Sequence, residues 1–107
     1  LAEMDAASLA GHFHNTYGMA IANIYQSLEQ GIRVFDSSIA GLGGCPYAKG
    51  ASGNVSTEDL YYLLSNMGYD TGIDLDALMI ASQNISQVLQ RTNPSNYANA
   101  YWQKRCA

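Results

Sequence analysis

Apolar positions along the first third of the chain predict a strand, a helix and a second strand. Residues 8–14 and 32–39 are short runs of small and apolar residues, typical of strands. Between them, Ile21, Ile24, Tyr25 and Leu28 have the i, i+3, i+4, i+7 spacing of one buried helix face, and Gly31 is expected to end the helix. Strand, helix and strand with short connections predict a βαβ unit with parallel strands and a right-handed crossover.

Two more helices are predicted in the second half. Ser56 and Asp59 have capping-box spacing and predict a helix to Met67, and Asp74 is expected to cap a longer helix to about Arg91. The residues expected to face inward are Leu60, Leu63, Leu64 and Met67 in the first, and Leu75, Leu78, Met79, Ser82, Ile85, Val88 and Leu89 in the second. For residues 97–107, a short docked helix and a frayed end both remain open.

A long glycine-rich segment, residues 41–54, separates the βαβ unit from these helices. Its fourteen residues contain five glycines, Pro46 and Cys45, so it is predicted to be a loop. Loops of more than about twelve residues within a domain are usually lids, binding loops or linkers. Glycines also let backbone amides approach a ligand closely. We favour a catalytic or binding loop; the alternative is a plain connection that holds a buried thiol.

Composition and charge narrow the class of protein. The chain has 107 residues, of which 48% are hydrophobic, enough for one globular unit. A net charge of -4 without a basic run argues against a nucleic-acid partner. No apolar run reaches the roughly eighteen residues that cross a bilayer, and no signal peptide is visible, so no membrane association is expected. Residues 1–5 resemble the end of a helix already under way, which suggests a piece of a longer protein.

The two cysteines lie in different contexts. Cys45 follows two glycines and precedes Pro46, whereas Cys106 is next to the last residue. We expect no disulfide between them, which favours a reducing compartment. The Cys45 loop is too rich in glycine to form a core, so we favour a thiol active in proton transfer or as a nucleophile over a small buried hydrophobic residue. Cys106 is expected to be a bystander or a surface redox site.

His12 and His14, the only histidines, are two residues apart and would point the same way from a strand. They are either an ordinary pair or ligands of one metal ion. With the Asn54 amide oxygen, they would suit Mg²⁺, Mn²⁺ or a borderline transition ion. The histidines and the Cys45 loop each follow a parallel strand, so they are expected at the sheet end where α/β proteins bind ligands.

Three motifs resemble the C-terminal part of 3-hydroxy-3-methylglutaryl-CoA lyases, from about Leu9 to about Leu89. They are HFHNTYG from His12 to Gly18, DSS from Asp36 to Ser38, and GLGGCPYAKGASGN from Gly41 to Asn54. Related metal-dependent enzymes, such as isopropylmalate synthase and hydroxy-oxovalerate aldolase, are similar at the His-x-His pair and the final Gly-Asn. They lack the Gly-Gly-Cys-Pro-Tyr insert, so the insert favours the lyases.

The resemblance implies an α/β fold, the C-terminal part of a TIM (β/α)8 barrel with its last two strands, their helices and C-terminal helices. Residues 1–107 would be the C-terminal fragment of one pyruvate-carboxyltransferase-like catalytic domain. A complete barrel needs about 250 residues. The fragment alone is therefore expected to be inactive and poorly stable, because two strands leave unpaired edges.

The implied activity is divalent-metal-dependent cleavage of 3-hydroxy-3-methylglutaryl-CoA to acetyl-CoA and acetoacetate, in leucine degradation and ketone-body formation. His12, His14 and Asn54 would bind Mg²⁺ or Mn²⁺, with His12 also relaying a proton, and Cys45 would be the catalytic thiol of a mobile loop. An acyl-CoA substrate, a homodimer of the full-length protein, and the bacterial cytoplasm or mitochondrial matrix are also implied.

The chain departs from the family pattern in two ways. Asn15 stands where many lyases have aspartate, and the family's first-strand aspartate ligand and neighbouring arginine belong to a region that this chain does not contain. Two other functions remain open. One is a related acyl-CoA lyase or aldolase with another substrate, and the other is a non-catalytic metal-binding or interaction module built from a half barrel.

Overall fold

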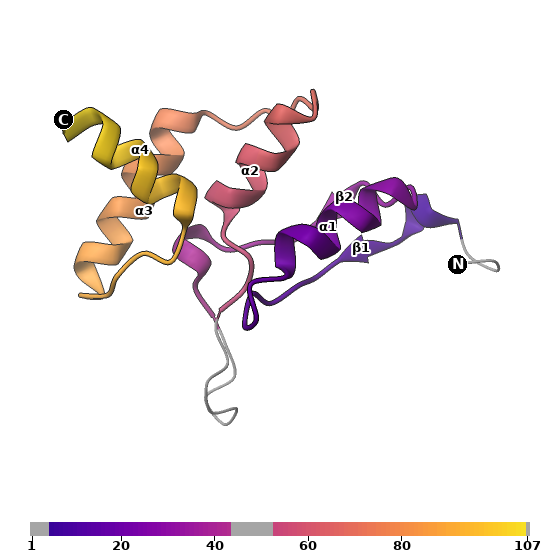
Figure 1. Cartoon of the computed structure of the whole chain (residues 1–107), viewed down its shortest axis with the longest axis horizontal. Helices are drawn as coiled ribbons and strands as arrows, with labels where there is room; N and C mark the ends of the chain where they lie inside the picture. The colour runs from indigo at the N-terminus through magenta and orange to yellow at the C-terminus, as the bar shows by residue number, and fades with distance from the viewer. Residues whose placement is uncertain (1–4, 44–52, 107) are drawn as a thin grey trace.

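A computed structural model describes residues 5–43 and 53–106 (Figure 1). Two strands and the first helix lie on one side of the molecule, and the three later helices gather on the other. The elements in chain order are η1 (Ala6–Ser8), β1 (Ala10–Gly11), α1 (Ala20–Glu29), β2 (Val34–Phe35), η2 (Ile39–Gly41), α2 (Thr57–Asn66), α3 (Leu75–Val88) and α4 (Asn96–Cys106).

The strands β1 and β2 are parallel and joined through α1, as predicted. Ala10 pairs with Val34 and Gly11 with Phe35. A Cβ atom on Gly11 would lie 2.7 Å from the Phe35 ring, so this close pairing requires glycine. The predicted strand lengths were wrong, because each strand covers two residues. In the described ranges each strand has one partner strand, and the chain beyond them forms isolated bridges.

The face of α1 forms the first core cluster. Ala20, Ile24 and Leu28 are buried and pack with Val55 and with Leu60 of α2. Gly31, at a φ of 96°, ends the helix region as predicted, because the left-handed conformation is one that glycine adopts without strain. The βαβ unit and the start of α2 thus share one core.

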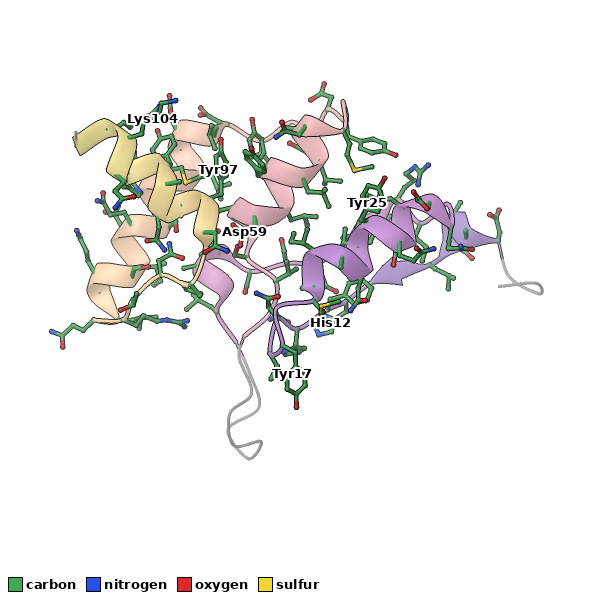
Figure 2. All side chains as sticks on the ribbon, in the orientation of Figure 1. His12, Tyr17, Tyr25, Asp59, Tyr97 and Lys104 are labelled. Carbon is green, nitrogen blue, oxygen red and sulfur yellow. The ribbon has the colours of Figure 1, made fainter. Side chains whose placement is uncertain are left out.

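The start of α2 is capped as the sequence predicts. The Ser56 hydroxyl oxygen accepts a hydrogen bond from the Asp59 amide at 3.2 Å. The Asp59 carboxylate does not return to Ser56. Instead it accepts bonds from the Ser95 hydroxyl at 2.8 Å and the Tyr97 amide at 3.0 Å, next to Tyr97 in Figure 2. Asp59 therefore ties the beginning of α4 to the beginning of α2.

The tail that the sequence left open is the docked helix α4. Met79 of α3 is buried with Ala98 and Tyr101 of α4 in a second core cluster. The Tyr101 hydroxyl donates to Asp76 at 2.5 Å, and this hydrogen bond raises the pKa of Tyr101 above its usual value. The Arg105 guanidinium lies 3.6 Å from the Tyr101 ring centroid. The contacts hold α4 against α3.

Some positions expected to face inward are exposed. Tyr25, Met67, Val88 and Leu89 have relative exposures of 46%, 38%, 75% and 50%, so these expectations were wrong. Within the described ranges each helix is covered along only part of its apolar face, and α3 ends at Val88, before the predicted Arg91. Gln90 has a φ of 51° and turns the chain out of the helix. No helix in the described ranges is both long and apolar enough to span a membrane.

Candidate functional site

His12 and His14 follow β1 directly and lie beside each other. Their ring centroids are 5.2 Å apart and the rings meet edge to face. Phe13, between them, packs against the first core cluster, so alternation along the extended chain directs both imidazoles away from that core. Bonds from imidazole to a metal are about 2.0–2.1 Å long. Two rings this close can therefore approach a single ion, as the sequence predicts.

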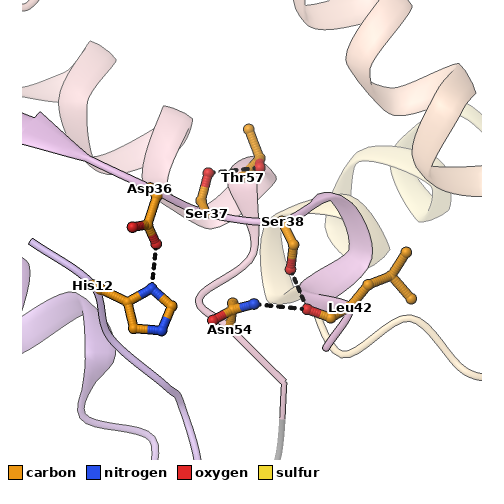
Figure 3. Close-up of polar contacts among 7 residues, drawn as sticks. All are labelled: His12, Asp36, Ser37, Ser38, Leu42, Asn54 and Thr57. Carbon is orange, nitrogen blue, oxygen red and sulfur yellow. Dashed lines mark hydrogen bonds and ion pairs between the residues drawn. The ribbon is translucent and has the colours of Figure 1, made fainter. Parts of the chain in front are cut away.

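Asp36 lies immediately after β2 and holds the His12 ring. Its Oδ1 atom is 2.5 Å from His12 Nδ1 (Figure 3). An ionised carboxylate only accepts hydrogen bonds, so Nδ1 carries the proton and Nε2 is left to bind an ion or a proton. Sequence reasoning gave Asp36 no role and placed it inside the predicted strand of residues 32–39, whereas it follows the observed β2 (Val34–Phe35) and lies at the same sheet end as the histidines.

Residues 53–55 return alongside residues 13–15. His14 and Asn54 form an isolated antiparallel bridge, and the Val55 amide donates to the Phe13 carbonyl at 3.0 Å. The Asn15 amide donates to the Gly53 carbonyl at 3.3 Å. The backbone thus brings Asn54 to the histidine pair, although some 40 residues separate them in the sequence.

The Asn54 side chain is held by one end only. Its Nδ2 donates to the Leu42 carbonyl at 3.1 Å, which also accepts the Ser38 hydroxyl at 2.5 Å. Its Oδ1 is buried and has no hydrogen-bond partner among residues 5–43 and 53–106. Figure 3 shows this oxygen on the side of Asn54 that faces the His12 ring. An unpaired buried acceptor costs about 1–3 kcal/mol. A cation beside the imidazoles would remove that penalty.

We define the loop neck as residues 40–43 and 53–54, the two described segments that flank residues 44–52. A Cβ atom on Gly53 would lie 1.7 Å from the Gly41 carbonyl oxygen, and one on Gly43 would lie 2.7 Å from Asn54 Nδ2. Only glycine allows the two segments to approach this closely. The loop that carries Cys45 therefore leaves and returns beside Asn54. Cys45 itself lies outside the described residues.

A buried carboxylate behind the loop neck was missed by sequence reasoning. Glu58 of α2 is fully buried, and both of its oxygens accept the Ala40 amide, at 3.0 and 3.1 Å. Ala40 has a φ of 54° and a ψ of 22°. This left-handed conformation costs a residue other than glycine roughly 1–2 kcal/mol. Charged residues in the first turn of a helix are usually exposed, so the sequence carries no signal for this burial.

The donor set of the site fits a hard divalent ion better than a structural zinc ion. Among residues 5–43 and 53–106, no group of three His, Cys, Asp or Glu side chains is placed to hold a metal. Two imidazoles and one amide oxygen form a partial set, and Mg²⁺ and Mn²⁺ commonly complete their coordination with water and substrate oxygens. The orphaned Asn54 Oδ1 is the observation that favours a metal at this position.

The larger cavities of the described structure do not coincide with the histidines. A groove of about 640 Å³ lies between α1, α2 and α4, and a cavity of about 90 Å³ lies beside Asn54 and Asn15. Asn15 Oδ1 accepts the Ala20 amide at 3.2 Å, at the start of α1. Because a carboxylate oxygen can accept the same bond, asparagine at this position leaves the local fold intact.

Asp36→Asn is expected to weaken Mn²⁺ binding at the predicted histidine site of the complete protein by about 10–100-fold, the usual effect of losing the partner that orients a metal-binding histidine. The shape is kept, but the carboxylate that fixes the His12 tautomer is lost. Steady-state kinetics against Mn²⁺ concentration measure the effect. Glu29→Gln, an exposed neutralisation on α1, is the matched control, and equal losses in both variants would contradict this role for Asp36.

Comparison with known proteins gives a consistent result. The sequence profile of the HMGL-like family matches residues 2–85. The chain is 59% identical over 98 residues to the 3-hydroxy-3-isohexenylglutaryl-CoA/hydroxy-methylglutaryl-CoA lyase of Pseudomonas aeruginosa, covering 92% of this chain and 33% of the relative. It is 52% identical over 98 residues to the mitochondrial hydroxymethylglutaryl-CoA lyase of Homo sapiens, covering 92% of this chain and 30% of the relative.

Solved structures agree with these sequence matches. The crystal structure of hydroxymethylglutaryl-CoA lyase from Pseudomonas aeruginosa superimposes with a TM-score of 0.89 at 57% identity, over 96% of this chain and 34% of that one. An HMG-CoA lyase from Acinetobacter baumannii in complex with coenzyme A and 3-methylmalate gives a TM-score of 0.85 at 44% identity, over 94% and 33%. The chain thus spans about a third of the length of the proteins it matches.

Proposed function

The chain belongs to the HMGL-like family, and we propose that within the complete protein it helps to cleave 3-hydroxy-3-methylglutaryl-CoA to acetyl-CoA and acetoacetate. Its parallel strands and their helices are part of a TIM barrel. The observation that carries the proposal is the buried oxygen of Asn54, which has no hydrogen-bond partner among the described residues and belongs to a residue bridged to His14 of the imidazole pair. The names of the relatives, at 52–59% identity, point to the same reaction.

The described residues act as one part of a larger site. We infer that residues 1–107 are the C-terminal part of a single catalytic domain, as the motif resemblance implies; they span about a third of the relatives' length. His12, His14 and Asn54 would hold Mg²⁺ or Mn²⁺. When bound, such an ion acts as a Lewis acid that favours loss of the proton from the substrate's hydroxyl group.

His12 can bind an ion or exchange a proton through one ring nitrogen, Nε2. The Asp36 carboxylate accepts a hydrogen bond from His12 Nδ1–H, so His12 can bind an ion or take up a proton only through Nε2. The two roles implied for His12 are therefore alternatives that it fills at different moments of the cycle. When Nε2 takes up a proton, the Asp36 carboxylate stabilises the positive ring, as the orienting carboxylate does in other acid–base sites.

The proposed reaction requires two proton transfers. The hydroxyl proton leaves to a base, the carbon–carbon bond breaks to give acetoacetate, and the acetyl-CoA carbon takes up a proton from an acid. We assign Cys45 to one of these transfers, because its loop begins and ends at the loop neck beside Asn54. A thiol can serve either as the acid or, once ionised, as the base.

A second candidate is a lyase for a larger acyl-CoA of the same type. The relative at 59% identity is named for 3-hydroxy-3-isohexenylglutaryl-CoA as well as the methyl compound. The coenzyme A and 3-methylmalate in the Acinetobacter structure likewise support an acyl-CoA substrate. We further propose a homodimer of the complete protein, which is what the family resemblance implies. We propose the cytosol or the mitochondrial matrix as its compartment, since the relatives include bacterial, cytoplasmic and mitochondrial forms.

The test is a cleavage assay of the complete protein with both acyl-CoA substrates and with Mg²⁺ or Mn²⁺. We expect acetyl-CoA and acetoacetate in equal amounts from 3-hydroxy-3-methylglutaryl-CoA, loss of activity with a chelator, and recovery when the metal is restored. Faster turnover of the isohexenyl compound would favour the second candidate. No cleavage of either substrate, with metal demonstrably bound, would refute the proposal.

A further inference from the structure

Glu58 is an unusual residue to find fully buried. Among the described residues its carboxylate has no Lys or Arg partner and is held by neutral donors. These are the Ala40 amide at 3.0 and 3.1 Å, the Ser82 hydroxyl at 2.5 Å and the Asn93 side-chain amide at 3.4 Å. Burial of a charge is expensive even when it is hydrogen-bonded. The position of this carboxylate is therefore expected to serve a purpose beyond packing.

The Glu58 carboxylate holds a strained turn at Ala40. Ala40 lies in the left-handed region, which is uncommon for alanine and persists where the surroundings impose it. Both Glu58 oxygens accept the Ala40 amide. Two backbone bonds span Ala40 within the turn: the Gly41 amide donates to the Ser38 carbonyl, and the Leu42 amide donates to the Ile39 carbonyl. Among the hydrogen bonds of the described residues, those to Glu58 are the ones that hold the Ala40 amide from outside its own turn.

The turn determines where the Leu42 carbonyl points. That carbonyl accepts Asn54 Nδ2 at 3.1 Å, the Asn54 amide at 3.4 Å and the Ser38 hydroxyl at 2.5 Å. The bond from Nδ2 to the Leu42 carbonyl fixes the orientation of the Asn54 side-chain amide. Its Oδ1 therefore remains on the side that faces His12 (Figure 3). The buried carboxylate is thus linked to the proposed metal ligand by hydrogen bonds at Ala40 and at Leu42, with the backbone of residues 40–42 between them.

We propose that Glu58 is a positioning residue for Asn54, acting through the left-handed Ala40 and the Leu42 carbonyl to present Asn54 Oδ1 to the ion. This inference rests on the proposed function, because it assigns Asn54 to the metal. It adds that metal affinity depends on a carboxylate that does not contact the metal. Such indirect partners commonly change metal affinity by about 10–100-fold.

The experiment compares Mn²⁺ dissociation constants of complete-protein variants, measured by electron paramagnetic resonance of free Mn²⁺, together with their melting temperatures. Glu58→Gln is expected to weaken Mn²⁺ binding about tenfold, because one of its side-chain groups becomes a donor that opposes the Ala40 amide. Ser82→Ala removes a different bond to the same carboxylate. It is expected to lower the melting temperature but to change the dissociation constant less than about twofold.

A second substitution distinguishes positioning from general destabilisation. Glycine adopts positive φ without strain, so Ala40→Gly in the Glu58→Gln background is expected to restore at least half of the lost affinity on a logarithmic scale. Unchanged Mn²⁺ binding in Glu58→Gln, no recovery with Ala40→Gly, or an equal loss of affinity in Ser82→Ala would overturn the inference.

A metal-free readout separates this inference from the proposed function. In a crystal structure of the metal-free Glu58→Gln protein, Ala40 should leave the left-handed region and Asn54 Nδ2 should lose its bond to the Leu42 carbonyl. If both features persist, the positioning role is refuted whatever the enzyme does. If Asn54→Ala binds Mn²⁺ as tightly as wild type, the assignment of Asn54 to the metal in the proposed function fails instead, and the crystal structure still decides whether Glu58 positions Asn54.

Discussion

His14→Ala is expected to lower the rate at which the complete protein cleaves 3-hydroxy-3-methylglutaryl-CoA about a thousandfold at limiting Mn²⁺. The charge stabilisation that a metal supplies is worth several kcal/mol, and each 1.36 kcal/mol changes the rate tenfold. His14 is bridged to Asn54 and lies beside the His12 ring, so its loss leaves only part of the donor set. Activity assays over a range of Mn²⁺ concentrations measure the effect.

His12→Ala is the informative partner of this variant. High Mn²⁺ should restore part of the activity of His14→Ala, whose role is metal binding alone. It should restore little in His12→Ala, since that variant would also lose the proposed proton relay at Nε2 of the ring that Asp36 holds through Nδ1. Gln26→Ala, an exposed change on α1, serves as the control. Equal recovery in both histidine variants would show that His12 has no role beyond holding the ion.

Cys45→Ser is expected to lower kcat by about 10²–10⁴, the usual contribution of a positioned acid or base. The serine hydroxyl has nearly the same size but is a far weaker acid than a thiol. Binding of Mn²⁺ should remain unchanged, because Cys45 is not assigned to the metal. Rapid-quench measurement of acetoacetate formation, together with Mn²⁺ titration, tests both expectations.

Cys106→Ser is the matched control for Cys45, since the chain has just these two cysteines. It should retain wild-type kcat, as expected of a bystander. If Cys45→Ser keeps full activity and only melts at a lower temperature, the thiol is a packing residue. The glycine-rich segment would then be a simple connection between η2 and α2.

The sequence was sufficient for the order of β1, α1, β2, α2 and α3 because its periodicities are local, but it left α4 open. The buried face of α1, the Ser56 cap and the glycine that ends α1 are each decided within a few residues of chain. Strand length was not predictable in the same way, because it depends on how many neighbours a strand pairs with. Burial of a helix face likewise depends on what packs against it. Val88 and Leu89 have apolar spacing but remain exposed.

The residues of the candidate site were also predictable only in part. His12, His14 and Asn54 were proposed from residue type and from their places in recognisable motifs, and the structure brings the three together. Two partners were missed, Asp36 and Glu58, because their roles depend on where a carboxylate lies after folding. A carboxylate in the first turn of a helix looks solvated in the sequence, and only the fold reveals that Glu58 faces inward.

The central claim is that His12 and His14 bind one divalent ion. It is tested most directly by electron spin-echo envelope modulation of Mn²⁺ bound to the complete protein, with histidine nitrogens labelled with ¹⁵N. The account predicts couplings to two imidazole nitrogens in the wild type, with one lost in His12→Ala and the other in His14→Ala. A wild-type spectrum without imidazole coupling, or one that neither substitution alters, would contradict it.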